Sequence, residues 1–377
     1  MSDRKILLGG FCGEGGLTVA LQRLALGLKA KGEDVEVVLK IVEGGDDSHV
    51  RSCLEDAGIR VWTLNHGTAP SFSNYLKRVF ELRSVIKKVN PTVVNFHYGG
   101  IFPWGSEFLA AKLAGVRRIF GSHHGWISSQ TRKVSFQRKL DGLLACRMSN
   151  GFVFLLEEQR QCFIEIYGKQ KHMPIILNGV KLPEVQIERK LARSQFGLPP
   201  EVFVIVFVGR IDGSKGVADL IQACSSSSAF LDQGYLLLAG DGDYRREYET
   251  LAEALIPNKF QFLGYRKDLD VILAAADVCA LLSHHETFAL AYLEAGAHGL
   301  ASLSYNIPAV KEVVLNGITG FQVPKQDIGA ASAAIDRLIN NQELTKEMGV
   351  KARQNVSSNF SLDRSVTAYL ELFTDLN

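Results

Sequence analysis

Short apolar runs alternate with longer segments of helical periodicity along the chain. In the first half the apolar runs are rich in β-branched residues, and they occur at KILLGG, VEVVLK, RVWTL, TVVNFH, RRIFGS, GFVFLL and MPIILN. Helix-period segments such as LTVALQRLALGLKAKG and YLKRVFELRSVIKKVN lie between several of them. Because short, nearly all-apolar strands between helices are typical of a parallel sheet covered on both faces, the first half predicts a doubly wound α/β domain over residues 1–180.

The alternation is interrupted once and then resumes. The segment NGVKLPEVQIERKLARSQFGLPPE contains scattered charges and three prolines, and it predicts a linker over residues 181–200. A second series of apolar runs follows at VFVIVFVG, YLLLAG, KFQFLG, DVCALLS, LASLSY and GFQVP, which predicts a second α/β domain over residues 201–360. We expect the carboxyl ends of both sets of strands to face a shared interdomain cleft. The final segment, over residues 361–377, predicts a helix that packs across either domain.

Composition places the chain among ordinary globular proteins. Its 377 residues are 46% hydrophobic and 22% charged, which is enough chain for two cores. The apolar run after MSDRK is too short for a signal peptide core, and no segment approaches the roughly 18 apolar residues of a membrane-spanning helix. Because the six cysteines are scattered without paired spacing, we expect reduced thiols and a cytoplasmic location.

The charge is divided unevenly between the two halves. Residues 1–180 contain 24 Lys and Arg against 16 Asp and Glu, a net charge of +8, whereas the remaining residues contain 18 against 24, a net charge of −6. The two halves are therefore expected to bind different partners. The basic half favours an anionic acceptor or an anionic membrane surface.

A glycine-rich loop follows the first strand. The segment FCGEGGLTVALQ places Gly15 and Gly16 directly before a predicted helix, whose N-terminus offers free N–H groups to a phosphate. The spacing is not GxGxxG, and the second strand ends in Lys40 instead of an acidic residue, so a dinucleotide site is weakly supported. A phosphate-binding loop and a plain tight turn both remain open.

The second domain begins with a strand whose loop carries two cations. The segment VFVIVFVGRIDGSKG places Arg210 and Lys215 after Gly209, at a strand carboxyl end and before a helix, which favours phosphate binding over isolated surface charges. The next strand ends in AGDGD. Asp241 and Asp243 imitate a metal-binding DxD there, but a Gly-rich turn that precedes a helix favours their interpretation as turn and cap residues.

Histidines end two strands of the first domain. TVVNFH ends at His97, and the strand of RRIFGSHHGW ends at His123 and His124. A histidine inside a strand is usually a core residue. A functional role is better supported for a histidine at a strand carboxyl end that precedes a glycine. His124 is the better placed of the pair because it directly precedes Gly125.

Two glutamates lie eight positions apart in SHHETFALAYLEAGAHG. The preceding DVCALLS predicts a buried strand, so HHET is expected to form a turn and the helix to begin near Thr287. Glu286 then lies beside the free N–H groups of the helix, and Glu294 lies two turns inside it. Because a buried carboxylate needs a hydroxyl or cationic partner, a sugar nucleotide suits this segment, with phosphate on the amides and ribose on Glu294.

The E-x7-E spacing of Glu286 and Glu294 resembles the donor-site signature of glycosyltransferase family 4, whose fold is GT-B. The resemblance covers nearly the whole chain. It includes the glycine loop, GSHHG, ILNGV, FVGRIDGSKG, LLLAGDGD, QFLGYRKDL, NGITGFQV and the closing FSLDRSVTAYLELF, and this many ordered matches make it specific. It implies two facing Rossmann-like domains, with the C-terminal helix crossing back onto the first.

The resemblance also implies an activity. Members of the family transfer a sugar from a nucleotide donor, here a UDP- or GDP-sugar, to a hydroxyl acceptor with retention and without an essential metal or cofactor. The expected acceptor is a glycan, a lipid-linked sugar or a small molecule in polysaccharide or glycoconjugate synthesis. No nucleic-acid partner is expected.

Site residues follow from the same resemblance. The implied catalytic set is His124, Glu286, Arg210 and Lys215, and the implied acceptor-side candidates are His97 and His123. The implied donor-binding residues are Gly15, Gly16, Gly209, Gly240, Tyr265, Thr287, Phe288, Ala289, Leu290 and Glu294. Ala289 stands where the family frequently has glycine, which leaves the identity of the transferred sugar open.

Other functions compete with this interpretation. A glycosidase using Glu286 and Glu294 leaves the Arg210 and Lys215 cluster unexplained, whereas an epimerase or phosphorylase of similar fold, or a non-catalytic sugar-nucleotide binding protein, accounts for the donor residues. Two basic, amphipathic segments, YLKRVFELRSVIKKVN and TRKVSFQRKLDGLLACRMSN, suggest peripheral contact with the inner membrane face. Ordinary surface helices are the alternative.

Overall fold

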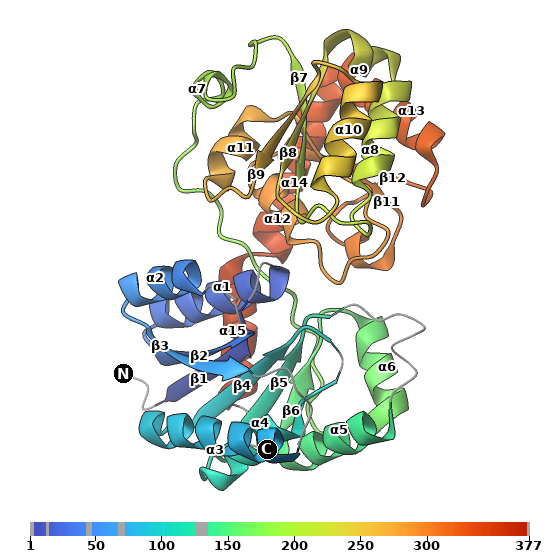
Figure 1. The fold of residues 1–377 in the computed structure, drawn as a ribbon. Helices are drawn as coiled ribbons and strands as arrows, with labels where there is room; N and C mark the ends of the chain where they lie inside the picture. The colour runs from blue at the N-terminus through green and yellow to red at the C-terminus, as the bar shows by residue number, and fades with distance from the viewer. Residues whose placement is uncertain are drawn as a thin grey trace. The chain divides into compact units, whose positions relative to one another are not determined.

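Parallel strands and helices alternate through both halves of the chain, in a computed structural model that describes residues 4–12, 15–42, 47–66, 72–100, 102–125 and 135–374. Two units result. The first contains Met1–Gly179 together with Leu362–Asn377, and the second contains Val180–Ser361. The chain therefore leaves the first unit once and returns to it for its last helix (Figure 1).

The first unit is built on a six-stranded parallel sheet in the order β3-β2-β1-β4-β5-β6. Its strands are β1 (Lys5–Phe11), β2 (Asp34–Val42), β3 (Arg60–His66), β4 (Val93–Tyr98), β5 (Arg118–His123) and β6 (Gly151–Val153). Its helices are α1 (Gly16–Ala30), α2 (Ser48–Asp56), α3 (Phe72–Val89), α4 (Gly105–Leu113), α5 (Phe136–Met148), α6 (Glu157–Tyr167) and α15 (Leu362–Thr374).

Alternate residues of each strand feed two separate cores. Ile6 and Leu8 of β1 pack with α1, α2 and α15, whereas Leu7 packs with α3, α4, α5 and α6 on the other face. This alternation follows from the two-residue period of a strand, and it requires the nearly continuous apolar runs of the sequence because both faces are covered. The helix α15 completes the first of these cores through residues such as Val366 and Phe373.

The second unit repeats this architecture. Its six-stranded parallel sheet has the order β12-β11-β10-β7-β8-β9, with strands β7 (Phe203–Val208), β8 (Gly234–Ala239), β9 (Phe260–Gly264), β10 (Val278–Leu281), β11 (Ala301–Tyr305) and β12 (Gly320–Val323). Its helices are α7 (Arg189–Ser194), α8 (Val217–Ser226), α9 (Ser228–Gln233), α10 (Arg245–Leu255), α11 (Leu269–Ala275), α12 (Leu290–Ala297), α13 (Ile328–Asn340) and α14 (Gln342–Asn359), with a 3-10 turn at Pro308–Val310. α8 packs against α9, α10 and α13, while α12 packs against α14 (Figure 1).

Both sheets reverse their strand order at one point. In the first sheet the reversal lies between β1 and β4, and in the second between β7 and β10. At such a point the loops that leave the two strands run to opposite faces of the sheet and leave a crevice, where open α/β sheets bind their ligands. The candidate residues of the sequence follow these strands in both units.

Two local predictions differ from the structure. The run MPIILN forms no regular strand. It pairs with β6 only through isolated bridges, because Pro174 lacks an N–H donor. Residues 181–200 belong to the second unit and include α7, which packs on α11 through its Arg193 side chain hydrogen bonded to the Ala275 carbonyl. The helix predicted over residues 361–377 is α15, Leu362–Thr374 in the described part of the chain, and it lies in the first unit.

Candidate active site

The loop after β7 carries the two cations predicted to bind an anion. Arg210 is 61% exposed, and its Nε donates to Asp212 Oδ2 at 2.5 Å. Asp212 also accepts from the backbone N and the Oγ of Ser214, at 2.8 and 2.6 Å. Burial alone raises the pKa of Asp212, but the hydrogen bonds from Ser214 and Arg210 outweigh burial and lower that pKa. The ionised carboxylate therefore shapes the turn that connects Arg210 to Lys215.

Lys215 meets Glu286 at the point where the second sheet reverses. Lys215 Nζ lies 2.6 Å from Glu286 Oε1, and the two side chains are only 21% and 9% exposed. Lys215 comes from the loop after β7, whereas Glu286 comes from the loop after β10, and these strands are neighbours. Two residues predicted separately from sequence thus form one partly desolvated ion pair. The electrostatic attraction between the two charges is stronger there than in water.

Glycines let the loops of this site pack backbone against backbone. Gly216, which precedes α8, has φ of 64°, and a Cβ there lies 1.8 Å from the carbonyl oxygen of Leu282. Gly240, predicted to bind the donor, lies against the equally predicted Gly209, and a Cβ on it lies 1.8 Å from the Gly209 carbonyl oxygen. Since L side chains rarely adopt a positive φ and these contacts leave no space, glycine is required at both positions.

A histidine and an aspartate beside this ion pair escaped the sequence analysis. His284 Nε2 lies 2.8 Å from Asp219 Oδ2, and the hydroxyl of Tyr305 donates to the same oxygen at 2.7 Å. The backbone N of His284 also donates to the Ser214 carbonyl at 2.8 Å. These contacts hold the loop that presents Glu286. The sequence did contain one signal for these residues, namely their position. His284 follows β10 closely and Tyr305 ends the neighbouring strand β11, so both lie at strand carboxyl ends.

The helix that follows begins later than predicted. α12 starts at Leu290 instead of near Thr287, with Ala289 as its N-cap. Thr287 and Phe288 therefore precede the helix, and Glu294 lies one turn inside it instead of two. Phe288 packs against Phe360 with ring centroids 6.1 Å apart, and Ala289 has a ψ of 86°, outside the helical range. The packing of Phe288 and the ion pair of Glu286 hold this segment outside the helix. Glu294 is half-buried.

Other donor-side predictions lie at the remaining strand ends of the second unit. Tyr265 follows β9 and is 56% exposed. Asp241 accepts from the backbone N of Gly242 at 2.8 Å and pairs with Arg245 at 3.3 Å, in agreement with its interpretation as a turn residue. Within the described residues, no group of three or more His, Cys, Asp or Glu side chains is arranged to hold a metal ion.

In the first unit the glycine loop leads into α1. Gly15 precedes this helix, Gly16 is its first residue, and both are exposed. No other atom lies within 4 Å of a Cβ built on Gly15, so the backbone is accessible at the helix N-terminus. Gly13, which belongs to the same predicted loop, lies outside the described residues. The site keeps the features expected of a phosphate-binding loop.

His97 and His124 form a stacked pair at the carboxyl ends of β4 and β5. His97 Nδ1 lies 2.8 Å from His124 Nε2, with ring centroids 5.0 Å apart. Burial lowers the pKa of both rings, and each has a neighbouring histidine that lowers it further; the pKa of His124 falls to about 3 and that of His97 well below its usual range. Both rings are therefore neutral at pH 7, and one nitrogen of the contact donates while the other accepts.

A chain of hydrogen bonds connects this pair to the C-terminal helix. Asn95 Nδ2 lies 3.2 Å from His97 Nε2, and the Ser122 hydroxyl donates to Asn95 Oδ1 at 3.1 Å. The hydroxyl of Tyr369, on α15, donates to Ser122 Oγ at 3.2 Å. With the Asn95 amide nitrogen donating to His97, His97 Nδ1 carries the proton and donates to His124, which leaves the proton of His124 on Nδ1.

His123 does not share this position. It is 1% exposed, its Nδ1 lies 2.9 Å from the Gly100 carbonyl, and the rings of Tyr98, Phe152, Phe154 and Phe163 surround it. Burial lowers its pKa to about 4. The structure thus places His123 in the core of the first unit. Because its side chain is buried there, it is not exposed to contact an acceptor as expected. The side chains of adjacent strand residues point to opposite faces, which separates it from His124.

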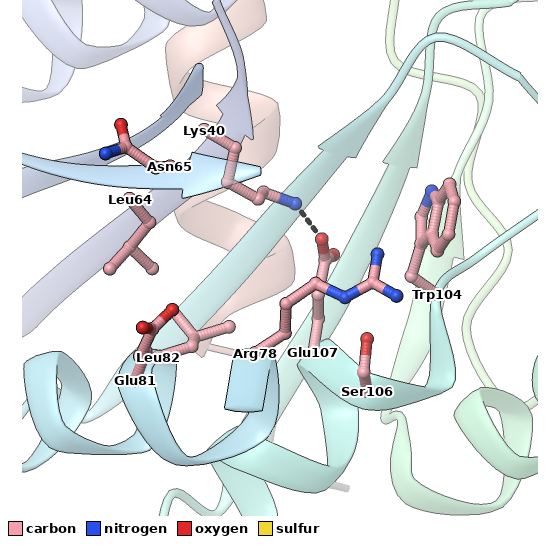
Figure 2. Close-up of a pocket in the computed structure, with 9 residues that line it drawn as sticks. All are labelled: Lys40, Leu64, Asn65, Arg78, Glu81, Leu82, Trp104, Ser106 and Glu107. Atoms are coloured by element: carbon pink, nitrogen blue, oxygen red, sulfur yellow. Dashed lines mark ion pairs between the residues drawn. The ribbon is translucent and has the colours of Figure 1, made fainter. Parts of the chain in front are cut away.

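A second Lys–Glu pair lies at the carboxyl end of β2, where the sequence analysis proposed no site. Lys40 and Glu107 form an ion pair whose side chains are each only 6% exposed. Figure 2 shows this pair among the residues that line a pocket, together with Arg78 of α3 and Trp104 just before α4. No local signal identified it, because Lys40 and Glu107 lie 67 positions apart in the sequence.

None of the helices within the described ranges is long and apolar enough to cross a membrane.

Family models match both units. The model of glycosyltransferase family 4 matches residues 14–183, and the model of glycosyl transferases group 1 matches residues 188–355. The two matches follow one another along the chain and together leave out only its ends and a four-residue gap at 184–187.

Relatives of known name span most of the chain. It is 26% identical over 312 residues to the UDP-Gal:alpha-D-GlcNAc-diphosphoundecaprenol alpha-1,3-galactosyltransferase of Escherichia coli, and this match covers 80% of each chain. It is also 26% identical over 405 residues to a glycogen synthase of Mycobacterium tuberculosis, covering 95% of this chain and 91% of the relative. The crystal structure of Anabaena HepE in complex with UDP and glucose superimposes with a TM-score of 0.84 at 21% identity, over 99% and 100% of the two chains. That structural likeness shows the fold, which is GT-B.

Proposed function

The chain belongs to the family 4 glycosyltransferases, and we propose that it transfers a hexosyl group from a nucleoside diphosphate sugar to an acceptor hydroxyl with retention at the anomeric carbon. The observation that carries this proposal is the meeting of Lys215 and Glu286 at the reversal point of the second sheet. A cation for the leaving diphosphate and a carboxylate for the sugar occupy one place there, next to the loop that leads into α12.

The main chemical demand of this reaction is the negative charge that develops on the departing diphosphate. Lys215 supplies a point charge, and Arg210 supplies a planar guanidinium that reaches into solvent from the same loop. In the protein without substrate, Lys215 is paired with Glu286. A diphosphate replaces this partner, which releases Glu286 to accept hydrogen bonds from hydroxyl groups of the sugar.

We assign the remaining predicted residues by the same chemistry. Glu294, half-buried on α12, accepts from the ribose hydroxyls, and the exposed Tyr265 lies near the base. We also propose that His124, which is neutral because burial lowers its pKa, offers a hydrogen bond to a substrate hydroxyl. The reaction as proposed uses no metal and no resident cofactor.

The relatives favour a uridine nucleotide and a phosphate-linked or glycan acceptor. The E. coli relative is named for UDP-Gal and for a diphosphoundecaprenol acceptor, and HepE was crystallised with UDP and glucose. We propose a UDP-hexose as the first donor to test and a GDP-hexose as the second. The proposed process is the synthesis of a polysaccharide or glycoconjugate.

The test begins with the donor and ends with the acceptor. A bound donor raises the melting temperature of the native protein, so UDP-, GDP- and ADP-sugars are compared by thermal shift. Release of nucleoside diphosphate is then followed with the stabilising donor, with and without an acceptor extract. We expect release to depend on acceptor, and to fall in a Glu294→Gln variant through a higher donor KM.

Three outcomes support the rival functions instead. Conversion of the donor without any acceptor indicates an epimerase. Hydrolysis of simple glycosides without a nucleotide indicates a glycosidase. Donor binding that persists with no turnover, combined with a His124→Ala variant that keeps its cellular function, indicates a sugar-nucleotide sensor.

We also propose that the first unit contacts an anionic membrane surface. Three neighbouring helices, α3, α4 and α5, expose large apolar side chains: Leu76, Phe80, Leu113, Phe136, Leu140, Leu143 and Leu144. Phe136 is 80% exposed, and basic residues of the same helix α5, such as Lys139 and Arg147, are exposed as well. A basic helix with an exposed apolar side binds anionic lipid through both contributions.

Co-sedimentation with anionic vesicles at low salt tests this contact. A Phe136→Ser/Leu140→Ser double variant is expected to lose binding, whereas Leu231→Ser, which removes an exposed apolar residue of the second unit, is expected to keep it. Equal binding by all three proteins contradicts the assignment of this surface.

A further inference from the structure

Two loops of the second unit lie beside one another and share more than the Lys215–Glu286 ion pair. The backbone N of His284 donates to the Ser214 carbonyl at 2.8 Å, and Lys215 Nζ lies 2.6 Å from Glu286 Oε1. Ser214 and Lys215 follow β7, whereas His284 and Glu286 follow β10, the neighbouring strand. The ion pair is thus one of several contacts that fix the carboxylate of Glu286 relative to the loop of Lys215.

Donor binding as proposed removes this ion pair. A diphosphate takes the place of Glu286 beside Lys215, and the glutamate is then free to accept from hydroxyl groups of the sugar. A side chain that loses its partner regains rotamer freedom, and its loop loses one constraint. The carboxylate therefore meets the sugar in a defined position only if other contacts hold the loop. The contacts that remain determine how well Glu286 can distinguish one sugar from another.

Asp219 supplies such contacts from the first turn of α8. Its Oδ2 lies 2.8 Å from Nε2 of His284 and accepts from the hydroxyl of Tyr305 at 2.7 Å. His284 lies two residues before Glu286, whereas Tyr305 ends β11, the strand paired with β10. The rings of His284 and Tyr305 are stacked, with centroids 6.0 Å apart. One carboxylate thus joins the helix that follows Lys215, the loop that carries Glu286 and the end of a third strand.

The three side chains are matched as donors and acceptor. Burial raises the pKa of Tyr305, and its hydrogen bond with Asp219 raises that pKa further, so the hydroxyl keeps its proton and donates. An ionised carboxylate can only accept, so Nε2 of His284 also carries a proton. The His284 and Asp219 side chains are only 23% and 19% exposed. Hydrogen bonds to a charged group that is partly removed from water are strong, which suits a network that holds a loop.

We propose that Asp219, His284 and Tyr305 are positioning residues for recognition of the donor sugar. Their network keeps the loop of Glu286 in place after a diphosphate has taken Lys215, so that the carboxylate accepts from the sugar hydroxyls at a fixed position. The inference rests on the proposed transfer reaction and deepens it. It assigns selectivity among sugars on one nucleotide to this network, whereas affinity for the nucleoside diphosphate itself depends on Lys215.

Binding of nucleotides with and without a sugar tests the network and requires no acceptor. UDP or GDP, whichever gives the larger thermal shift, is compared by calorimetry with its sugar nucleotides: UDP-glucose, UDP-galactose and UDP-N-acetylglucosamine, or GDP-mannose, GDP-glucose and GDP-fucose. We expect the wild type to prefer one of these sugars. Tyr305→Phe and His284→Phe each keep a ring but lose a donor to Asp219. Both are expected to weaken binding of the preferred sugar nucleotide about tenfold, and to change the Kd of the nucleoside diphosphate by less than about twofold.

A conservative variant and a matched control separate positioning from general stability. Glutamine places an N–H close to the position of a histidine Nε2, so His284→Gln is expected to restore the sugar preference that His284→Phe removes. Tyr235→Phe removes a hydroxyl that donates to the Phe260 carbonyl at 3.0 Å, between β8 and β9 of the same unit. It makes the same chemical change away from Asp219, and we expect this control to bind every nucleotide as the wild type does.

The pattern of affinity losses decides between the roles. Loss of sugar preference with an unchanged Kd for the nucleoside diphosphate supports the positioning role. An equal loss of affinity for the nucleotide with and without its sugar shows a structural role only and overturns the proposal, as does wild-type preference in both Tyr305→Phe and His284→Phe. Equal binding of all the sugars by the wild type also overturns it. Failure of the wild type to bind either UDP or GDP contradicts the proposed donor instead, so the two failures are distinguishable.

Discussion

The two units each place a lysine–glutamate pair at the carboxyl end of a parallel sheet, yet the pairs differ in exposure and in origin. Lys215 and Glu286 come from two loops at the reversal point of the second sheet, and Lys215 is 21% exposed. Lys40 and Glu107 come from a strand and a helix of the first unit, and both are 6% exposed. Lys215 of the second unit thus keeps some contact with solvent, whereas both members of the pair in the first unit are buried.

This difference indicates what each pair does. Charges that lie on loops and retain some contact with water exchange one partner for another at modest cost, which suits a residue that must bind and release a diphosphate. Charges fixed inside regular elements lose much more when their partner is removed. The difference is consistent with our proposal that the first of these residue pairs binds the donor, and it gives the Lys40–Glu107 pair a structural role in the first unit.

The largest expected effect separates the pairs by stability. Lys40→Met removes the cation that is paired with the buried Glu107, so we expect the free energy of unfolding of the first unit to fall by about 3–5 kcal/mol. All three tryptophans of the sequence, Trp62, Trp104 and Trp126, precede residue 180, so urea unfolding followed by tryptophan fluorescence reports this unit. The Lys40→Met/Glu107→Leu double variant is expected to recover most of the loss. A single variant as stable as wild type contradicts the buried pair.

The next effect separates them by activity. Lys215→Ala and Arg210→Ala each remove a charged contact to the leaving diphosphate, worth about 1.5–3 kcal/mol, so we expect kcat to fall at least tenfold. Tryptophan fluorescence is expected to show an unchanged first unit. Lys311→Ala, which removes an exposed lysine of the second unit, is the control and should keep full activity. Full activity in either loop variant rules out its role at the diphosphate.

Low pH is expected to reduce the stability of the first unit through its buried histidines. Burial lowers the pKa of His123 to about 4 and that of His124 to about 3, so below pH 6.5 the unfolded chain binds protons that the native first unit does not. Stability therefore falls as pH falls from 6.5 towards 4, by about 1 kcal/mol per pH unit for each such histidine. Urea unfolding at pH 7 and pH 5 measures this loss. His123→Phe, which places a ring among aromatic neighbours, is expected to reduce the slope, and an unchanged slope contradicts the burial argument.

Salt gives the smallest expected difference. Raising NaCl from about 50 to 500 mM shortens the screening length, which weakens accessible charges more than buried ones. We expect the affinity for nucleoside diphosphate to fall by a few-fold, with no matching decrease in the tryptophan-monitored stability of the first unit. Calorimetry and urea unfolding at the two salt concentrations check this. A stability loss that parallels the affinity loss indicates that the Lys40 pair is solvated after all.

The sequence predicted the elements whose signals are local. Both strand series follow from short apolar runs, which arise because each sheet is covered on both faces. The prediction was wrong at residues 173–178, where Pro174 prevents regular pairing, and at the start of α12, where Phe288 and Glu286 hold the chain outside the helix. The first failure has a local cause, a proline inside the run, whereas at the second contacts from elsewhere in the fold override the local pattern.

The same distinction applies to the candidate site. Lys215 and Glu286 were predicted because each follows a strand directly, but their 2.6 Å contact depends on which strands are neighbours. Tyr369 and Ser122 are 247 positions apart, and nothing in either local sequence predicts that a helix at the far end of the chain reaches the histidine pair. His123 and His124 are adjacent in sequence, and only the direction in which each side chain leaves the chain separates a core residue from a site residue.

The return of α15 has a consequence for the order in which the protein is made. Val366 and Phe373 belong to the core formed by β1 and α1, while Arg4 Nη1 donates to the Leu370 carbonyl at 3.2 Å. On the ribosome, residues 180–361 are synthesised before this helix, so the second unit has its whole sequence available while the first still lacks one wall of its core. The first unit is therefore completed after the second, and the nascent protein exposes the apolar residues that α15 covers until this helix has been synthesised.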